Sequence, residues 1–121
     1  MGEEAELLTA CKRVLRLFAS HGVLTWRRIH VMPIAVGAGL KRFRKNHDMA
    51  GMPDLLVWIK GGPCVSIELK QRKGKQRDEQ MAFQSELTRV GHPYWIVRSL
   101  DEFIDVLKRY NVALRQIGIF R

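Results

Sequence analysis

Two short apolar segments separated by a glycine and proline turn constrain the fold of this chain more than any other feature. Residues 55–59 read Leu-Leu-Val-Trp-Ile, residues 64–69 read Cys-Val-Ser-Ile-Glu-Leu, and Gly61-Gly62-Pro63 lies between them. β-branched and aromatic residues favour strands, and Gly and Pro favour turns. The pattern predicts an antiparallel β-hairpin.

The loop of this hairpin decides which polar side chains share a face. A three-residue loop at 61–63 would place Asp54 opposite Lys70, whereas a loop centred one residue earlier would place it opposite Glu68. An even-length loop would put Asp54 on the other face of the sheet. Apolar and polar residues alternate along 65–70, which favours one apolar face and one polar face. Both odd registers therefore bring an aspartate, a glutamate and a lysine together.

These residue types suit a divalent metal ion and phosphodiester chemistry. Mg²⁺ prefers oxygen ligands, with one or two carboxylates and several waters. Asp54 and Glu68 supply two carboxylates, and the backbone carbonyl of Leu69 is well placed for a third oxygen. Such an ion polarises a phosphoryl oxygen and lowers the pKa of water. Lys70 would orient the water or offset charge that develops in the transition state.

The charge of the chain points to a polyanionic partner. Its 21 Lys and Arg residues outnumber 12 Asp and Glu residues, which gives a formal net charge of +9. Such an excess is typical of proteins that bind nucleic acid. Two basic clusters flank the acidic centre, and they could also be solvated loops. We expect phosphate contacts from the basic residues Lys41, Arg42, Arg44, Lys45, Arg72, Lys73, Lys75 and Arg98.

Two motifs resemble a known family. Gly51-Met52-Pro53-Asp54 followed by Ile67-Glu68-Leu69-Lys70, with Gln80 beyond them, is similar to the PD-(D/E)XK nuclease superfamily. The closest resemblance is to its VRR-NUC branch, which includes small stand-alone phage and bacterial proteins. The resemblance implies an α/β, restriction-endonuclease-like core with a mixed central β-sheet flanked by helices. It also implies DNA cleavage that depends on Mg²⁺ or Mn²⁺.

The resemblance assigns roles to individual residues. Asp54 and Glu68 match the metal ligands, and Lys70 matches the catalytic lysine. Gln80 matches a glutamine that points from a helix toward the site, and is counted with the catalytic residues. An acidic residue of the first helix often completes such a site. Glu6 is the best match for it, with Glu3 and Glu4 as competitors.

The chain is expected to form one domain over residues 1–121, as its length suggests. Apolar spacing predicts helices near 4–19, 78–90 and 99–110. Strands are expected at 23–31 and 94–97 besides the hairpin. Residues 32–50 are predicted to be a basic mobile loop, either a substrate flap or a segment without a role. The tail 111–121 could add a strand or contact a second subunit.

Other residue types set further expectations. Trp26, Trp58 and Trp95 are expected to be core side chains rather than platforms for bases. Cys11 and Cys64 are expected to be reduced rather than bridged. The sequence contains no apolar run long enough to span a bilayer. We therefore expect no membrane partner and a cytoplasmic location, in a bacterium or a phage-infected cell.

The combined hypothesis is a metal-dependent DNA endonuclease. By analogy with the family, it would act on branched or junction DNA, with a homodimer as a possible assembly. A non-catalytic DNA-binding accessory module with a nuclease-like fold is the main alternative. An RNA-binding protein is a third class, and no aromatic motif of RNA-binding domains supports it.

Overall fold

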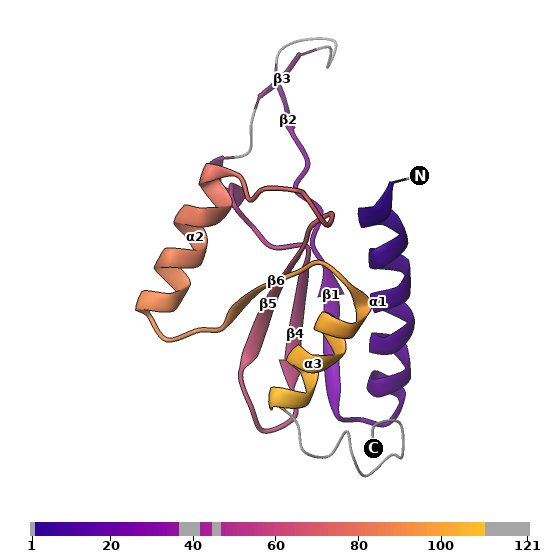
Figure 1. The fold of residues 1–121 in the computed structure, drawn as a ribbon. Helices are drawn as coiled ribbons and strands as arrows, with labels where there is room; N and C mark the ends of the chain where they lie inside the picture. Colours follow the sequence, from indigo (N-terminus) through magenta and orange to yellow (C-terminus); the bar gives the residue numbers. More distant parts are fainter. Residues whose placement is uncertain (1, 37–41, 45–46, 111–121) are drawn as a thin grey trace.

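The computed structural model describes residues 2–36, 42–44 and 47–110, and within them it shows a four-stranded mixed β-sheet with three α-helices (Figure 1). A separate pair of short strands extends from one end of the sheet. The elements in chain order are α1 (Glu3–Ser20), β1 (Leu24–Arg28), β2 (Ile34–Val36), β3 (Arg42–Arg44), the 3-10 helix η2 (His47–Met49), β4 (Leu55–Ile59), β5 (Cys64–Leu69), α2 (Asp78–Arg89), β6 (Tyr94–Val97) and α3 (Leu100–Tyr110).

The main sheet has the strand order β1-β4-β5-β6. β1 pairs with β4, and β4 with β5, in antiparallel fashion, whereas β5 and β6 are parallel. Leu55 is paired with Ile67 and Trp58 with Cys64, so the hairpin takes the second of the two predicted registers. Continued by one residue, this pairing sets Asp54 opposite Glu68. The predicted hairpin and its parity are confirmed.

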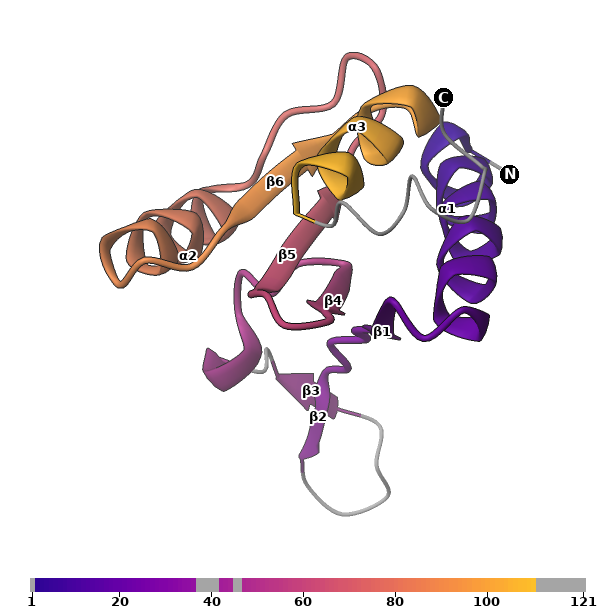
Figure 2. The same cartoon turned by 90° about the horizontal axis from the view of Figure 1, so that it is seen from below.

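One face of the sheet is covered by α1 and α3, which pack against it and against each other (Figures 1 and 2). Alternate residues of β4 and β5 point into this core, as their pleat requires. Those buried strand residues are Leu55, Val57, Ile59, Val65, Ile67 and Leu69.

The other face is covered only in part. Phe83 of α2 packs edge-on against Tyr94 of β6, with ring centroids 6.5 Å apart. Trp58 lies on this face of β4 and is 40% exposed, so the prediction that it is a core residue is wrong. The helix that covers this face sits beside β6, two strands away from β4. Trp26 and Trp95, in contrast, are partly buried against the core, as expected.

The prediction that residues 32–50 form a loop is wrong in part. β2 and β3 form a short antiparallel hairpin in which Ala35 pairs with Phe43, and η2 follows it. Strands of three residues are too short to show a recognisable alternation of apolar and polar residues, and glycines lie between these two. The predicted tail 111–121 lies outside the described residues.

The two cysteines are free thiols, as predicted. Burial raises the pKa of Cys11 to about 12, and it also raises the pKa of Cys64. Among the helices that the structure describes, none is both long and apolar enough to cross a membrane.

Gly51 fixes the approach of the chain to Asp54. Its φ of +83° lies in the left-handed region, and a Cβ there would come within 2.3 Å of the Glu79 carbonyl oxygen in α2. Pro53 is fully buried two residues later. The Gly-Met-Pro-Asp segment therefore packs closely against α2 and fixes the start of β4 there.

This close approach generates a stability prediction. Gly22 also has a positive φ, of +73°, but a Cβ there would meet nothing within 4 Å. Gly22→Ala should cost about 1–2 kcal/mol of unfolding free energy from backbone strain alone. Gly51→Ala should cost about 1–3 kcal/mol more, because it adds a steric clash. Urea unfolding of both variants measures the difference, and equal losses would contradict the contact with α2.

Candidate metal centre

Asp54 is held at the head of β4 by contacts with two neighbouring strands. Its backbone carbonyl accepts a hydrogen bond from the Ile29 amide at 2.8 Å. Its side-chain Oδ2 accepts a hydrogen bond from the Leu69 amide at 2.7 Å. The carboxylate is thereby fixed beside the end of β5, and its Oδ1 is not part of that bond.

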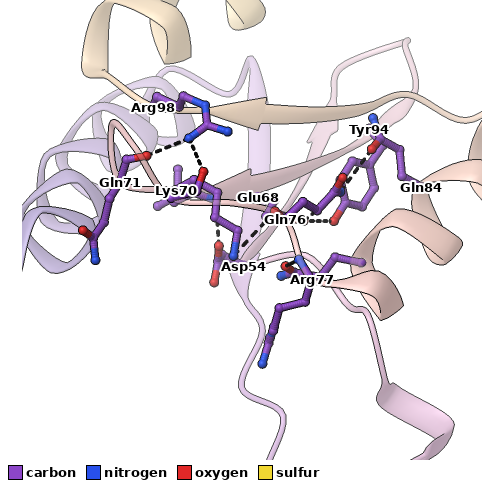
Figure 3. A network of polar contacts seen from close by, with 12 residues as sticks. Asp54, Glu68, Lys70, Gln71, Gln76, Arg77, Gln84, Tyr94 and Arg98 are labelled. Carbon is purple, nitrogen blue, oxygen red and sulfur yellow. Dashed lines mark hydrogen bonds and ion pairs between the residues drawn. The ribbon is translucent and has the colours of Figure 1, made fainter.

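Glu68 is a carboxylate with no exposed surface. Its Oε1 accepts hydrogen bonds from the Tyr94 hydroxyl and, at 3.3 Å, from Gln76 Nε2 (Figure 3). Its Oε2 is buried and has no hydrogen-bond partner among the described residues. The Lys70 ammonium lies 3.8 Å from that atom, and the Lys70 side chain is 13% exposed. A buried oxygen with this little compensation is costly, so the site is suited to a cation.

Tyr94 is a neutral donor in this network. Burial, and then the hydrogen bond and charge of Glu68, raise the pKa of Tyr94 well above its ordinary value. The hydroxyl therefore keeps its proton across the physiological pH range, and it donates a hydrogen bond to Glu68 Oε1.

A pocket of about 260 Å³ opens beside Asp54 at this end of the sheet. Glu4 of α1 lines it together with Arg28, Asp54 and Leu69. A strand residue directs its N–H and C=O to the same side, so the Leu69 carbonyl faces the edge where its amide meets Asp54. Glu6, the residue favoured by the resemblance, is exposed and does not line the pocket, whereas its competitor Glu4 does.

These groups fit a small hard cation. Asp54, Glu68 and the Leu69 carbonyl are oxygen donors, and Mg²⁺ commonly binds through one or two carboxylates while it keeps several waters. No group of three or more His, Cys, Asp or Glu side chains is placed to hold a metal within the residues that the structure describes. The donor set thus suits Mg²⁺ or Mn²⁺, and does not resemble a closed structural zinc site.

Gln80 caps a helix, and a different glutamine contacts the site. Gln80 is buried, and its Oε1 accepts a hydrogen bond from the Arg77 amide at 3.1 Å, so it caps the first turn of α2. Gln76, which precedes the helix, is the glutamine that reaches Glu68. Its Nε2 also donates to Gln84 Oε1 at 3.1 Å.

A basic loop, residues 71–77, joins β5 to α2 beside the carboxylates. Arg72, Lys73 and Lys75 are exposed on it, as expected for phosphate contacts. Arg98 is expected to contact phosphate. In the structure its Nη1 instead donates to the carbonyls of Gln71 and Gly74 at 2.7 and 2.6 Å (Figure 3). Arg98 thus anchors the loop that carries the basic side chains.

Two residues of the second basic cluster lie on the hairpin arm formed by β2 and β3. Arg42 and Arg44 belong to β3, and Lys41 and Lys45 lie outside the described residues. Figure 1 shows the arm beyond the same end of the sheet as the start of α1 and the start of α2. The basic loop and the arm that carries Arg42 and Arg44 therefore lie at the end of the sheet that holds Asp54.

Three residues of the site were missed in the sequence. Tyr94 and Gln76 meet Glu68 only through the parallel pairing of β6 with β5 and through the path of the basic loop, and neither carries a local signal. Arg28 lines the pocket from β1, and its Nε is buried without a hydrogen-bond partner among the described groups. The position of Arg28 beside Asp54 follows from the β1–β4 register alone.

No protein-family model, curated protein or solved structure matches this chain. The motif resemblance therefore remains an expectation, and the arrangement of the site rests on the geometry described above.

The site predicts that a bound divalent ion raises the free energy of unfolding of this chain. Mn²⁺ at 100 times its Kd should raise the unfolding free energy by about 2.7 kcal/mol, because the ion binds only the folded chain. Glu68→Gln should abolish this gain, since it removes the charge of the buried ligand. Glu86→Gln, an exposed change on α2, should keep it. Thermal melts with Mn²⁺ and with chelator measure the effect, and an unchanged gain in Glu68→Gln would rule out this site.

Proposed function

We propose that this chain is a Mg²⁺-dependent DNA endonuclease of the PD-(D/E)XK type with a restriction-endonuclease-like core. One observation carries the proposal: the buried Oε2 of Glu68 lacks a hydrogen-bond partner among the described groups and lies 3.8 Å from Lys70. Asp54 is fixed directly across the hairpin from Glu68. The four-stranded mixed sheet with three helices is compatible with the mixed α/β core that the motif resemblance implies.

The acidic centre is unexpected in a chain that only binds nucleic acid. Phosphate and carboxylate repel each other, so Asp54 and Glu68 would weaken DNA binding by a chain whose net charge is otherwise favourable, at +9. A divalent ion reverses this effect, because it binds both kinds of oxygen. The carboxylates therefore favour a catalytic site over a passive one.

Each polar residue has a role in the proposed hydrolysis. A bound Mg²⁺ supplies the positive charge that polarises the phosphodiester and lowers the pKa of water. Asp54 and Glu68 would hold the ion, with the Leu69 carbonyl beside them. Lys70, held 3.8 Å from Glu68, places an ammonium where negative charge develops on the phosphoryl oxygens.

DNA would approach over the basic loop and the hairpin arm. Arg72, Lys73 and Lys75 are exposed on a loop that two hydrogen bonds from Arg98 hold in shape. A further bond joins the Arg72 amide to Glu3 Oε2 at 3.3 Å, and so ties the loop to α1. Contacts of this kind position a phosphate backbone without reading its sequence.

A non-catalytic DNA-binding module is the second candidate. It is favoured by the small number of acidic ligands, since no group of three is found in the described part of the chain. A cleavage panel of single-stranded, duplex, flap and four-way junction DNA decides between the two, with Mg²⁺, Mn²⁺ or chelator. The same panel tests the proposal that branched DNA is the preferred substrate, and sedimentation with and without DNA tests a homodimer.

Removal of either carboxylate or of the lysine ammonium should slow cleavage strongly. Asp54→Asn, Glu68→Gln and Lys70→Ala should each lower the cleavage rate by at least about 10²-fold, the usual effect of losing one group that stabilises transition-state charge. Lys60→Ala removes an exposed lysine from the far end of the same hairpin and should leave the rate unchanged. Gel assays in Mg²⁺ measure the rates, and wild-type cleavage by Glu68→Gln would refute the mechanism.

The basic loop should set the salt dependence of DNA binding. The slope of log K against log salt is negative, by about 0.9 for each phosphate contact. Changing Lys73 and Lys75 together to Ala should therefore make this slope less negative by about 2. Changing Arg13 and Lys60, which are exposed away from this loop, should leave the slope unchanged. Fluorescence anisotropy with duplex DNA in chelator gives both slopes, and equal slopes would place the interface elsewhere.

A further inference from the structure

The two oxygens of the Glu68 carboxylate have very different surroundings. Oε1 accepts hydrogen bonds from two donors, Tyr94 and Gln76. Oε2 accepts none among the described groups, although both atoms are buried in the same side chain. A carboxylate that merely filled the core would be expected to share its donors between its oxygens.

We propose that Tyr94 and Gln76 are positioning residues that make Glu68 a one-oxygen ligand for a divalent cation. The inference rests on the proposed function, since it deepens the role of the same site. Two donors on Oε1 fix the rotation of the carboxylate and use both lone pairs of that oxygen. Oε2 is then the atom left for the ion, on the side where Lys70 lies.

The donors are themselves fixed, so they can hold Glu68 rather than follow it. The Tyr94 ring belongs to β6, where Tyr94 pairs with Ser66, and it packs edge-on against Phe83. Gln76 Nε2 donates to Gln84 Oε1 at 3.1 Å as well as to Glu68. Both amide hydrogens of Gln76 are thus in use, which fixes the direction of its side chain.

The two oxygens of the Asp54 carboxylate also differ in their contacts. Its Oδ2 accepts the Leu69 amide, so that the two carboxylates each have one oxygen bound to the protein. A pair of one-oxygen ligands suits Mg²⁺ and Mn²⁺, which prefer octahedral geometry with several waters. Ca²⁺ takes six to eight oxygens and often binds a carboxylate through both. The arrangement therefore selects the smaller ions by restricting the number of protein oxygens.

The test uses the two tyrosines of the chain. Tyr94→Phe removes the hydroxyl that donates to Glu68, and Tyr110→Phe removes the hydroxyl that accepts from Trp95 Nε1 at 2.6 Å. Mn²⁺ affinity is measured by electron paramagnetic resonance on the full chain, with Ca²⁺ as competitor. Tyr94→Phe should weaken Mn²⁺ binding about 10- to 100-fold, the usual effect of losing a partner behind a metal ligand. Tyr110→Phe should leave it unchanged.

Two further readouts separate positioning from general damage. The preference for Mn²⁺ over Ca²⁺ should fall in Tyr94→Phe, because Glu68 becomes free to bind through both oxygens. Saturating Mn²⁺ should restore most of its cleavage rate, since the hydroxyl touches neither ion nor substrate. Gln76→Leu should show the same pattern, and it serves as the test if Tyr94→Phe fails to fold.

The outcomes are distinct for the two proposals. Wild-type protein that binds Mn²⁺ while Tyr94→Phe and Gln76→Leu bind it equally well, with the same preference over Ca²⁺, overturns the positioning role alone. Wild-type protein that binds no Mn²⁺ and cuts no DNA overturns the proposed function, and the positioning role with it.

Discussion

Burial of the Glu68 carboxylate is the constraint on which the rest of this structure depends. A carboxyl side chain that has no exposed surface needs compensation from its neighbours. The fold meets this need from three directions: Tyr94 reaches it from β6, Gln76 from the loop before α2, and Lys70 from the end of its own strand. Parallel pairing of β6 with β5 and the placement of α2 therefore serve the site as well as the core.

Much of the hairpin could be read from the sequence, yet its register could not. Alternation along β5 fixes the face of every side chain, and so it predicts that Asp54, Glu68 and Lys70 lie together. It does not choose between two odd loops, because both satisfy the same apolar pattern. The choice depends on turn geometry, here a Gly61 with φ of +68° and a bond from the Ile59 amide to the Pro63 carbonyl.

Helical periodicity could have identified Glu4 as the acidic residue of α1 that lies near the site. Cys11, Leu15 and Phe18 are buried along one stripe of the helix, and Leu8 continues it toward the N-terminus. One turn earlier the same stripe reaches Glu4, the residue that lines the pocket beside Asp54. Tyr94 and Gln76 had no such signal, because contacts that cross a parallel strand pair or an irregular loop depend on tertiary structure alone.

Two charge patterns meet at one end of the sheet, and each changes what the other can bind. The positive charges of the basic loop favour phosphate, while the carboxylates beside the loop repel it. A divalent ion at the carboxylates removes that repulsion, and a bound phosphate adds oxygens for the ion. In the proposed nuclease, metal and DNA should therefore strengthen each other's binding by the same factor, because the coupling free energy between two sites is reciprocal. A surface that carried only basic residues would gain nothing from the ion.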